Sequence, residues 1–227
     1  MYARSVKRKL DILLSGTALL LLSPVLLVTA LLVRKNLGSP VLFTQLRPGQ
    51  GERIFRMYKF RTMTDERGAD GKLLPDEARL TDFGKFLRES SLDELPELFN
   101  ILKGDMSIVG PRPQLVRDMV FMTKAQRRRH SVLQGLTGLA QVMGRNNISW
   151  EEKLRWDQRY VRHVTFLGDV WILIRTVVNV LKREDINTDG MATAEDFGDY
   201  LLRTGKVNQA TYERRQRIAR RICQKYS

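Results

Sequence analysis

At 227 residues the chain is long enough to bury one hydrophobic core, and 43% hydrophobic residues with only 7 prolines exclude a largely disordered protein. The net charge of +14 predicts anionic partners such as phospholipid headgroups, phosphorylated substrates or nucleic acid. The only cysteine is Cys223, which excludes an intramolecular disulfide and fits a reducing cytosol.

The N-terminal region holds an uncharged, mostly apolar run at residues 12–33, which is long enough to cross a membrane. Pro24 lies in its middle, and a helix should break there because proline lacks a backbone N–H and clashes with the preceding turn. The Ser23 hydroxyl can satisfy a freed backbone group. Basic residues flank both ends, and a re-entrant helix-break-helix hairpin keeps both clusters on the cytoplasmic side. The alternative is a kinked single-pass anchor, since transmembrane helices tolerate proline.

After this run, the pattern predicts a small β element followed by helices. Residues 41–45 and 53–62 are extended segments on either side of a turn, and the charged residues 64–80 form a surface loop. Apolar residues at helical spacing then predict helices at residues 82–89, 92–103, 149–163 and 170–183. The last helix could lie on a membrane surface, although a core helix shows the same single apolar stripe.

The fold class expected from these elements is an α-dominated α+β protein. The membrane hairpin would occupy residues 1–36, and a compact cytosolic helical domain with interfacial amphipathic helices would occupy residues 37–197. Residues 198–227 would form a basic helical extension, because eight Lys or Arg stand against one Glu from residue 203 onward. This tail could bind anionic lipid or an acidic polymer, although a solvated helix is the simpler explanation.

The segment SSLDELPELFN places Asp93 and Glu94 at a predicted helix start, where Ser90 or Ser91 would cap the helix and Pro96 would stand in its first turn. The positive end of a helix dipole stabilises a carboxylate and also attracts phosphate. Adjacent helical residues diverge by about 100°, so one carboxylate could attack a phosphoryl group while the other binds a metal ion. The alternative is a Ser91–Glu94 capping box without a catalytic role.

Cationic residues around this pair predict a phosphate-binding environment. Lys59 and Arg61 lie on one face of the predicted strand, about 6.6 Å apart, and could grip adjacent phosphates of a diphosphate. Arg88 precedes the acidic pair, Arg112 stands between two prolines, and Arg145 follows a glycine. Arginines held in this way can clamp phosphate with bidentate geometry, although each alone could be a solvated surface charge.

Four ordered motifs make the chain resemble a known family. They are YKFRTM from Tyr58, SLDELPELFN, KGDMSIVGPRP and GLTGLAQVMGRN. The resemblance covers roughly residues 6–197. The chain resembles the bacterial sugar transferases, also called monotopic phosphoglycosyl transferases, and is similar in size to their small members. Gln134 stands where a proline is common and Met143 where Asn or Ser is common, so the identity of the sugar stays open.

The resemblance implies a phosphoglycosyl transferase on the cytoplasmic face of the bacterial inner membrane, with a re-entrant helix broken at Ser23 and Pro24. Asp93 would attack the sugar-bearing phosphate of a UDP-sugar and release UMP. Polyprenol phosphate would then take the sugar 1-phosphate from the covalent Asp93 intermediate. Asp93 and Glu94 would also hold Mg²⁺ at the diphosphate. The residues implied to bind substrate are Lys59, Arg88, Arg112, Arg145, Asp157 and Asp169.

The expected partners are therefore a UDP-sugar, polyprenol phosphate and the phospholipid membrane, with a homodimer left open and no nucleic acid. One rival is a membrane-anchored nucleic-acid-binding protein, which would explain the positive charge and the RRRH run from Arg127. A second rival is a non-catalytic scaffold, which would need neither the acidic pair nor the ordered cations. Loss of activity in Asp93→Asn, with folding and membrane association kept, would separate the enzyme from both.

Overall fold

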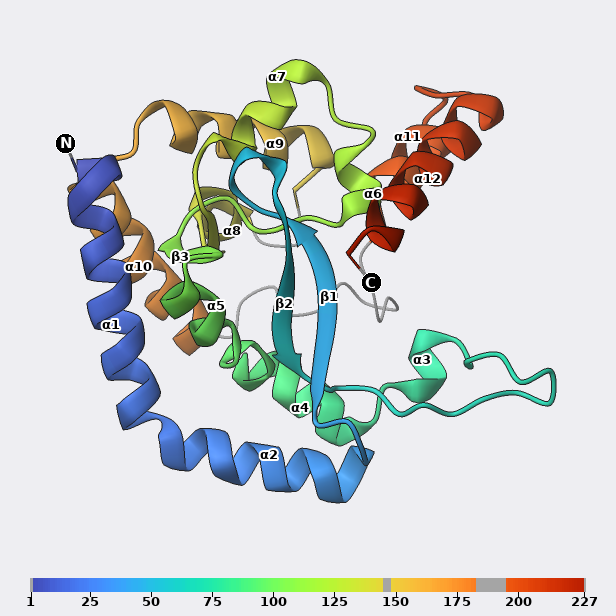
Figure 1. Cartoon of the computed structure of the whole chain (residues 1–227), viewed down its shortest axis with the longest axis horizontal. Coiled ribbons are helices and arrows are strands. Elements are labelled where there is room, and N and C mark those ends of the chain that lie inside the picture. Colours follow the sequence, from blue (N-terminus) through green and yellow to red (C-terminus); the bar gives the residue numbers. More distant parts are fainter. Residues whose placement is uncertain (1, 145–147, 183–194, 227) are drawn as a thin grey trace.

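The computed structural model describes residues 2–144, 148–182 and 195–226, in which helices dominate over two small sheets (Figure 1). The strands are β1 (Leu42–Pro48), β2 (Ile54–Phe60), β3 (Met106–Val109) and β4 (Gln134–Thr137). The longer helices are α1 (Lys7–Leu21), α2 (Ser23–Leu37), α4 (Asp82–Glu89), α5 (Glu97–Lys103), α9 (Trp150–Arg162), α10 (Phe166–Lys182), α11 (Phe197–Arg203) and α12 (Gln209–Gln224). The shorter helical turns are η1 (Tyr2–Val6), η2 (Gln50–Glu52), α3 (Asp76–Arg79), η3 (Leu92–Glu94), α6 (Val116–Met119), α7 (Lys124–Arg127), η4 (Arg128–Ser131) and α8 (Leu139–Gly144). The expected helix-dominated α+β class with a small β element is confirmed.

The predicted helix break lies where the sequence places it. Helix α1 ends at Leu21 and α2 begins at Ser23, with a bend of 63° between them. The Ser23 hydroxyl donates to the Leu20 carbonyl at 2.8 Å, which satisfies an acceptor freed at the break. In the described residues no single helix is long and apolar enough to cross a membrane, whereas this bent pair could, by length and composition.

The two helices form an L rather than a hairpin folded back on itself (Figure 1), because each packs on a different part of the domain. On α1, the buried Asp11 accepts a hydrogen bond from the Ile108 amide of β3 at 3.0 Å. Arg8 donates to the Ile101 carbonyl near the end of α5 at 2.6 Å. On α2, Val33 is fully buried in a cluster that includes Phe60 and Leu87.

Strands β1 and β2 form an antiparallel pair in register from Leu42 opposite Phe60 to Pro48 opposite Ile54. The far edge of β2 is attached to α5 through one side chain. The Tyr58 amide donates to Asn100 Oδ1 at 3.0 Å, and Asn100 Nδ2 donates to the Arg56 carbonyl at 2.7 Å. Asn100 is fully buried, so it fixes the sheet against the helix that follows the acidic pair.

A second pair, β3 and β4, is parallel and was not predicted from the sequence. Both strands are only four residues long, and the chain between them passes through α6, α7 and η4 before β4 pairs. Two glycines allow the backbone segments beside these strands to approach each other closely. The Gly110 amide donates to the Thr137 carbonyl at 2.9 Å, and the Gly135 amide donates to the Pro111 carbonyl at 2.9 Å.

We expect Gly135→Ala to lower the free energy of unfolding by about 3 kcal/mol or more, because overpacking against backbone cannot be relieved by a side-chain rotation. A Cβ on Gly135 would lie 2.1 Å from the Gly110 amide nitrogen. Gly16 in α1 is the matched control, since its added Cβ would meet nothing within 4 Å. Thermal unfolding in detergent measures both variants, and equal melting temperatures for the two would contradict the prediction.

The predicted surface loop and the C-terminal helices are also present. The chain after β2 projects from the body with α3 at its base (Figure 1), and isolated bridges join Met63 to Leu80 and Arg67 to Leu73. Helices α11 and α12 lie on the opposite side of the molecule from α1 (Figure 1). The buried Ala219 of α12 packs in a cluster with α6.

Candidate active site

The acidic pair lies in η3, a single 3-10 turn just before α5. Pro96 stands between the turn and α5, so the helix expected over residues 92–103 is divided in two. Its expected end is confirmed, because Gly104 terminates α5 in a left-handed conformation. Asp93 is only 8% exposed, so its carboxylate is largely withdrawn from water.

The predicted serine cap of this turn is wrong. Ser91 has a φ of 56° and its side chain forms no capping hydrogen bond, whereas an N-cap residue needs an extended backbone. The Ser90 hydroxyl instead donates back to the Phe86 carbonyl of α4 at 2.7 Å. A Ser91–Glu94 capping box therefore does not explain Glu94.

Lys59 on β2 lies among three carboxylates. Its Nζ atom is 2.6 Å from Glu94 Oε1, 3.3 Å from Glu97 Oε1 and 3.7 Å from Asp93 Oδ2. Sequence reasoning missed Glu97, which is 1% exposed. The sequence feature that could have placed Glu97 at the site is its spacing of three residues from Glu94, because residues three apart face the same side of a helical segment.

Arg112 binds the acidic pair from another side, with Nη2 2.6 Å from Glu94 Oε1. Burial opposes the ionisation of Glu94, but Arg112 and Lys59 outweigh it and hold the pKa of Glu94 well below its usual range. Burial raises the pKa of Asp93, although Lys59 opposes it. Burial also depresses the pKa of Lys59, but the carboxylates around it, Glu94 first, outweigh this and raise it. Glu94 is therefore a fixed anion, and Asp93 is the more easily protonated member of the pair.

We expect the stability of Glu97→Gln relative to the wild type to be greater at pH 8 than at pH 5. Burial raises the pKa of Glu97 from 4.5 to about 7. Since the folded-state pKa lies above the unfolded value, the wild type loses stability as the pH rises from 4.5 to about 7. A tenfold change in an acid dissociation constant corresponds to about 1.4 kcal/mol, so the difference between variant and wild type should grow by about 3 kcal/mol across this window. Thermal unfolding of both proteins at pH 5 and pH 8 measures it, and an equal difference at the two pH values would contradict it.

The loop that carries Arg112 is supported from behind by a buried ion pair. Arg129 Nη2 donates to the Arg112 carbonyl at 2.6 Å, and Arg129 Nε lies 2.8 Å from Asp157 Oδ2. The Arg129 and Asp157 side chains are 0% and 4% exposed. Asp157, implied by the resemblance to bind substrate, thus reaches the site through Arg129 among the described residues.

Arg88 and Arg61 have separate surroundings. Arg88 on α4 donates from Nε to Thr62 Oγ1 at 3.1 Å. Burial lowers the pKa of Arg88 and Asp93 opposes this, so these two side chains lie within electrostatic range. Arg61 Nη2 lies 2.8 Å from Asp65 Oδ2. Lys59 and Arg61, predicted to act as a pair, therefore engage different acids.

Asp169 on α10 lies in a different cluster from the acidic pair. Its Oδ2 atom accepts hydrogen bonds from Lys7 Nζ at 2.6 Å and from the Tyr2 hydroxyl at 2.7 Å, and its Oδ1 atom accepts from the Tyr160 hydroxyl at 2.9 Å. Asp169 thus ties the N-terminus to α9 and α10. The remaining predicted phosphate ligand, Arg145, lies outside the described residues.

The carboxylates at the site are hard oxygen donors, which suit Mg²⁺ better than softer metals. Within residues 2–144, 148–182 and 195–226, no group of three His, Cys, Asp or Glu side chains could hold a metal ion by itself. Lys59 and Arg112 both contact the same oxygen of Glu94, Oε1. A metal ion bound here would therefore need oxygen ligands from a substrate in addition to those of the protein.

This site lies within a sequence pattern shared with known proteins, since the model of the family described as bacterial sugar transferase matches residues 2–183. The chain belongs to the bacterial sugar transferase family. It is 49% identical over 192 residues to a Bacillus subtilis protein named "Uncharacterized sugar transferase EpsL", covering 85% of this chain and 95% of EpsL.

Longer relatives carry more specific names. One, from Aeromonas hydrophila, is named a UDP-N-acetylgalactosamine-undecaprenyl-phosphate N-acetylgalactosaminephosphotransferase and is 36% identical, covering 78% of this chain and 44% of that protein. Another, from Klebsiella pneumoniae, is named a UDP-glucose:undecaprenyl-phosphate glucose-1-phosphate transferase and is 38% identical, covering 75% of this chain and 39% of that protein. The expected family and the expected class of enzyme, a phosphoglycosyl transferase, are both confirmed.

Proposed function

We propose that this protein transfers a sugar 1-phosphate from a UDP-sugar to polyprenol phosphate, undecaprenyl phosphate in bacteria, releasing UMP and forming a polyprenol-diphosphate-sugar. The observation that carries the proposal is the environment of Asp93. Its carboxylate is buried, lies 3.7 Å from Lys59 and is within electrostatic range of Arg88 and Arg112. Such a group can act as a nucleophile toward a phosphate that the surrounding cations hold.

The reaction would proceed by two displacements at the same phosphorus atom. An Asp93 oxygen attacks the sugar-bearing phosphorus, and the bond from that phosphorus to the bridging oxygen of UMP breaks. An oxygen of polyprenol phosphate then attacks the phosphosugar-Asp93 intermediate and returns the carboxylate. Lys59 and Arg112 neutralise charge on the phosphoryl oxygens, while Glu94 remains ionised between these two cations.

We propose Mg²⁺ as the cofactor. Mg²⁺ is commonly held by one or two carboxylates and completes its coordination with substrate phosphate oxygens and water. The carboxylates of Asp93 and Glu94 fit this role, because they are hard oxygen donors beside the position proposed for the diphosphate. The ion would supply charge neutralisation at the transferring phosphoryl group.

We also propose that α1, α2 and α10 attach the protein to the cytoplasmic face of the bacterial inner membrane. Apolar side chains are strongly exposed on all three helices: Leu20 78%, Leu27 62%, Leu31 61%, Leu167 77%, Ile174 58% and Leu181 77%. Each half of the bent pair has 15 residues and reaches about 22 Å, which is short of a hydrocarbon core of about 30 Å. Entry into a single leaflet, with the basic ends on one side, accommodates this length.

The test is UMP release by detergent-solubilised protein from a panel of UDP-sugars with undecaprenyl phosphate and Mg²⁺. We expect UMP from at least one donor and none after EDTA is added. A folded protein that releases no UMP from any donor would contradict the reaction, and salt-sensitive DNA binding would then be measured for the nucleic-acid alternative. Flotation with liposomes tests the membrane proposal separately.

A further inference from the structure

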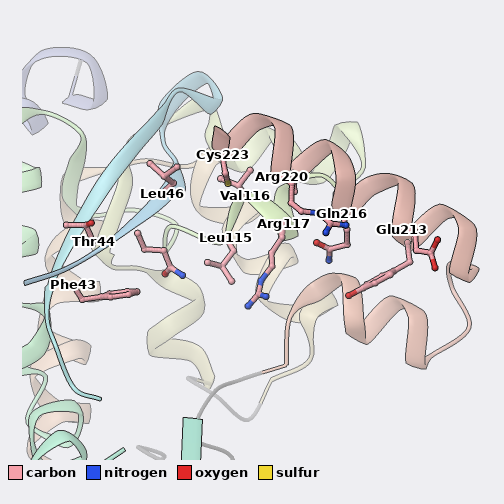
Figure 2. A pocket seen from close by; sticks show the side chains of 13 residues that line it. Phe43, Thr44, Leu46, Leu115, Val116, Arg117, Glu213, Gln216, Arg220 and Cys223 are labelled. Atoms are coloured by element: carbon pink, nitrogen blue, oxygen red, sulfur yellow. The ribbon is translucent and has the colours of Figure 1, made fainter. Parts of the chain in front are cut away.

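A groove of about 740 Å³ lies away from the acidic pair, between β1, α6 and α12. Figure 2 shows Thr44 and Leu46 of β1 at the left, Cys223 and Arg220 of α12 to their right, and Arg117 below these two. The wall formed by α12 lies outside residues 2–183, the part that matches the family. The groove is therefore completed by a segment of this chain that the family pattern does not include.

The groove runs along the edge of β1 rather than over one face of the sheet. Its lining includes four consecutive residues of the strand, Phe43 to Leu46. Successive side chains of a strand point to opposite faces, so consecutive residues can share a groove only where it follows the strand edge. In the described residues β1 pairs with β2 alone, and its other edge has no strand partner.

The register identifies which backbone groups point into the groove. The Tyr58 amide and the Arg56 carbonyl bond to Asn100, so at these residues β2 directs its backbone groups away from β1. Their partners Thr44 and Leu46 therefore form non-hydrogen-bonded pairs with β2, and their own N–H and C=O groups point to the open edge. An extended segment laid along β1 would find donors and acceptors at strand spacing.

The charge of the groove favours an acidic occupant. Arg220 is exposed and has no ion-pair partner within the described residues, and Arg117 is half exposed although it pairs with Asp196 at 2.6 Å. Glu213 is the acid on the rim, and it accepts a hydrogen bond from Gln209. Eight Lys or Arg against one Glu from residue 203 onward add to the positive potential of this wall.

We propose that this groove binds an extended, acidic polypeptide segment of a partner protein as an additional strand on the open edge of β1. Backbone hydrogen bonds to Thr44 and Leu46 would give affinity, and acidic side chains facing Arg117 and Arg220 would give specificity. A second copy of this chain fits less well, because pairing two β1 edges would bring together two chains of net charge +14. The interaction is independent of sugar transfer.

The test is fluorescence anisotropy of a labelled eight-residue peptide of alternating Glu and Val, titrated with the full chain in detergent. We expect binding that weakens with added salt, and at least tenfold weaker binding of a Lys-Val peptide of the same length. Arg220→Glu should weaken binding of the acidic peptide about tenfold. The matched control is Arg217→Glu, which makes the same charge change on α12 at an exposed position outside the groove and should bind as the wild type does.

A second pair of variants tests the strand edge itself. Thr44→Pro removes a backbone N–H that points away from β2 and so breaks no bond to β2, whereas Thr44→Val keeps that N–H. We expect loss of peptide binding in the first and not in the second, at equal melting temperature. No binding of the acidic peptide, equal loss in Arg217→Glu, or unchanged binding in Thr44→Pro would overturn the proposal. A dimer in sedimentation that Thr44→Pro dissociates would also overturn it, in favour of a second copy.

Discussion

Asp93→Asn should lower the rate of UMP release by at least about 10³-fold, since single removals of a covalent nucleophile from an enzyme commonly cost this much or more. The amide has the same shape as the carboxylate but cannot attack phosphorus. Within the described part of the chain, the Asp93 side chain makes no hydrogen bond, and its close contact is the 3.7 Å approach of Lys59. The melting temperature and liposome flotation should therefore stay close to those of the wild type, which separates a chemical defect from a folding defect.

Intact-mass spectrometry shows whether Asp93 is the residue that carries the phosphosugar. With a UDP-sugar and Mg²⁺ but no polyprenol phosphate, the wild type should gain the mass of one sugar phosphate, and Asp93→Asn should gain none. Asp82→Asn is the matched control, because it makes the same change at an exposed aspartate of α4 that pairs with Lys85, and it should gain the adduct as the wild type does. An adduct that persists in Asp93→Asn would mean that another residue is the nucleophile.

The same residue should set the acid limb of the pH profile. Burial raises the pKa of Asp93 above that of an exposed aspartate. The fraction of ionised nucleophile therefore begins to fall at a higher pH than it would for an exposed aspartate as the solution is acidified. UMP release measured across pH gives this limb, and a profile that is flat down to the pKa of a free aspartate would argue against a buried nucleophile.

Local features of the fold were predictable because their causes are local. Pro24 breaks the N-terminal helix because it lacks a backbone N–H and clashes with the preceding turn, and Gly104 ends α5 because glycine accepts a left-handed conformation. The helix predicted from residue 149 also begins there, because the Ser149 side chain accepts from the Glu152 amide and caps it. Each depends on a few consecutive residues, which the sequence displays directly.

Features that depend on distant residues were not predictable in the same way. The parallel pairing of β3 with β4 joins segments more than twenty residues apart, and four-residue strands carry little pattern. The burial of Glu97 depends on Lys59, which reaches it from another element. Asp157 and Asp169 are equally acidic in the sequence, yet one pairs with a buried arginine and the other with Lys7, Tyr2 and Tyr160. A sequence motif identifies such acids without showing what they face.

Asp157 offers the sharpest test of that distinction, because its pairing with Arg129 predicts a role in stability. Asp157→Ala would leave the fully buried Arg129 guanidinium without its counter-ion. Breaking a buried pair in this way costs about 3–5 kcal/mol, which for a chain of this size lowers the melting temperature by roughly 6–20 °C. Replacing both partners by apolar residues, as in Arg129→Met with Asp157→Leu, should restore much of the loss, because no unpaired charge is then buried.

The remaining activity of these variants would show how far the pair also positions Arg112. Arg129 donates to the Arg112 carbonyl at 2.6 Å, so the double variant should recover stability while UMP release stays reduced through misplacement of Arg112. The single variant Asp157→Leu keeps the buried Arg129 guanidinium without its counter-ion, so it should be less stable than the double variant. Asp157→Ala could instead have the melting temperature of the wild type and only a raised KM for the UDP-sugar. That result would mean that Asp157 contacts the substrate directly and that its ion pair with Arg129 breaks when the donor binds.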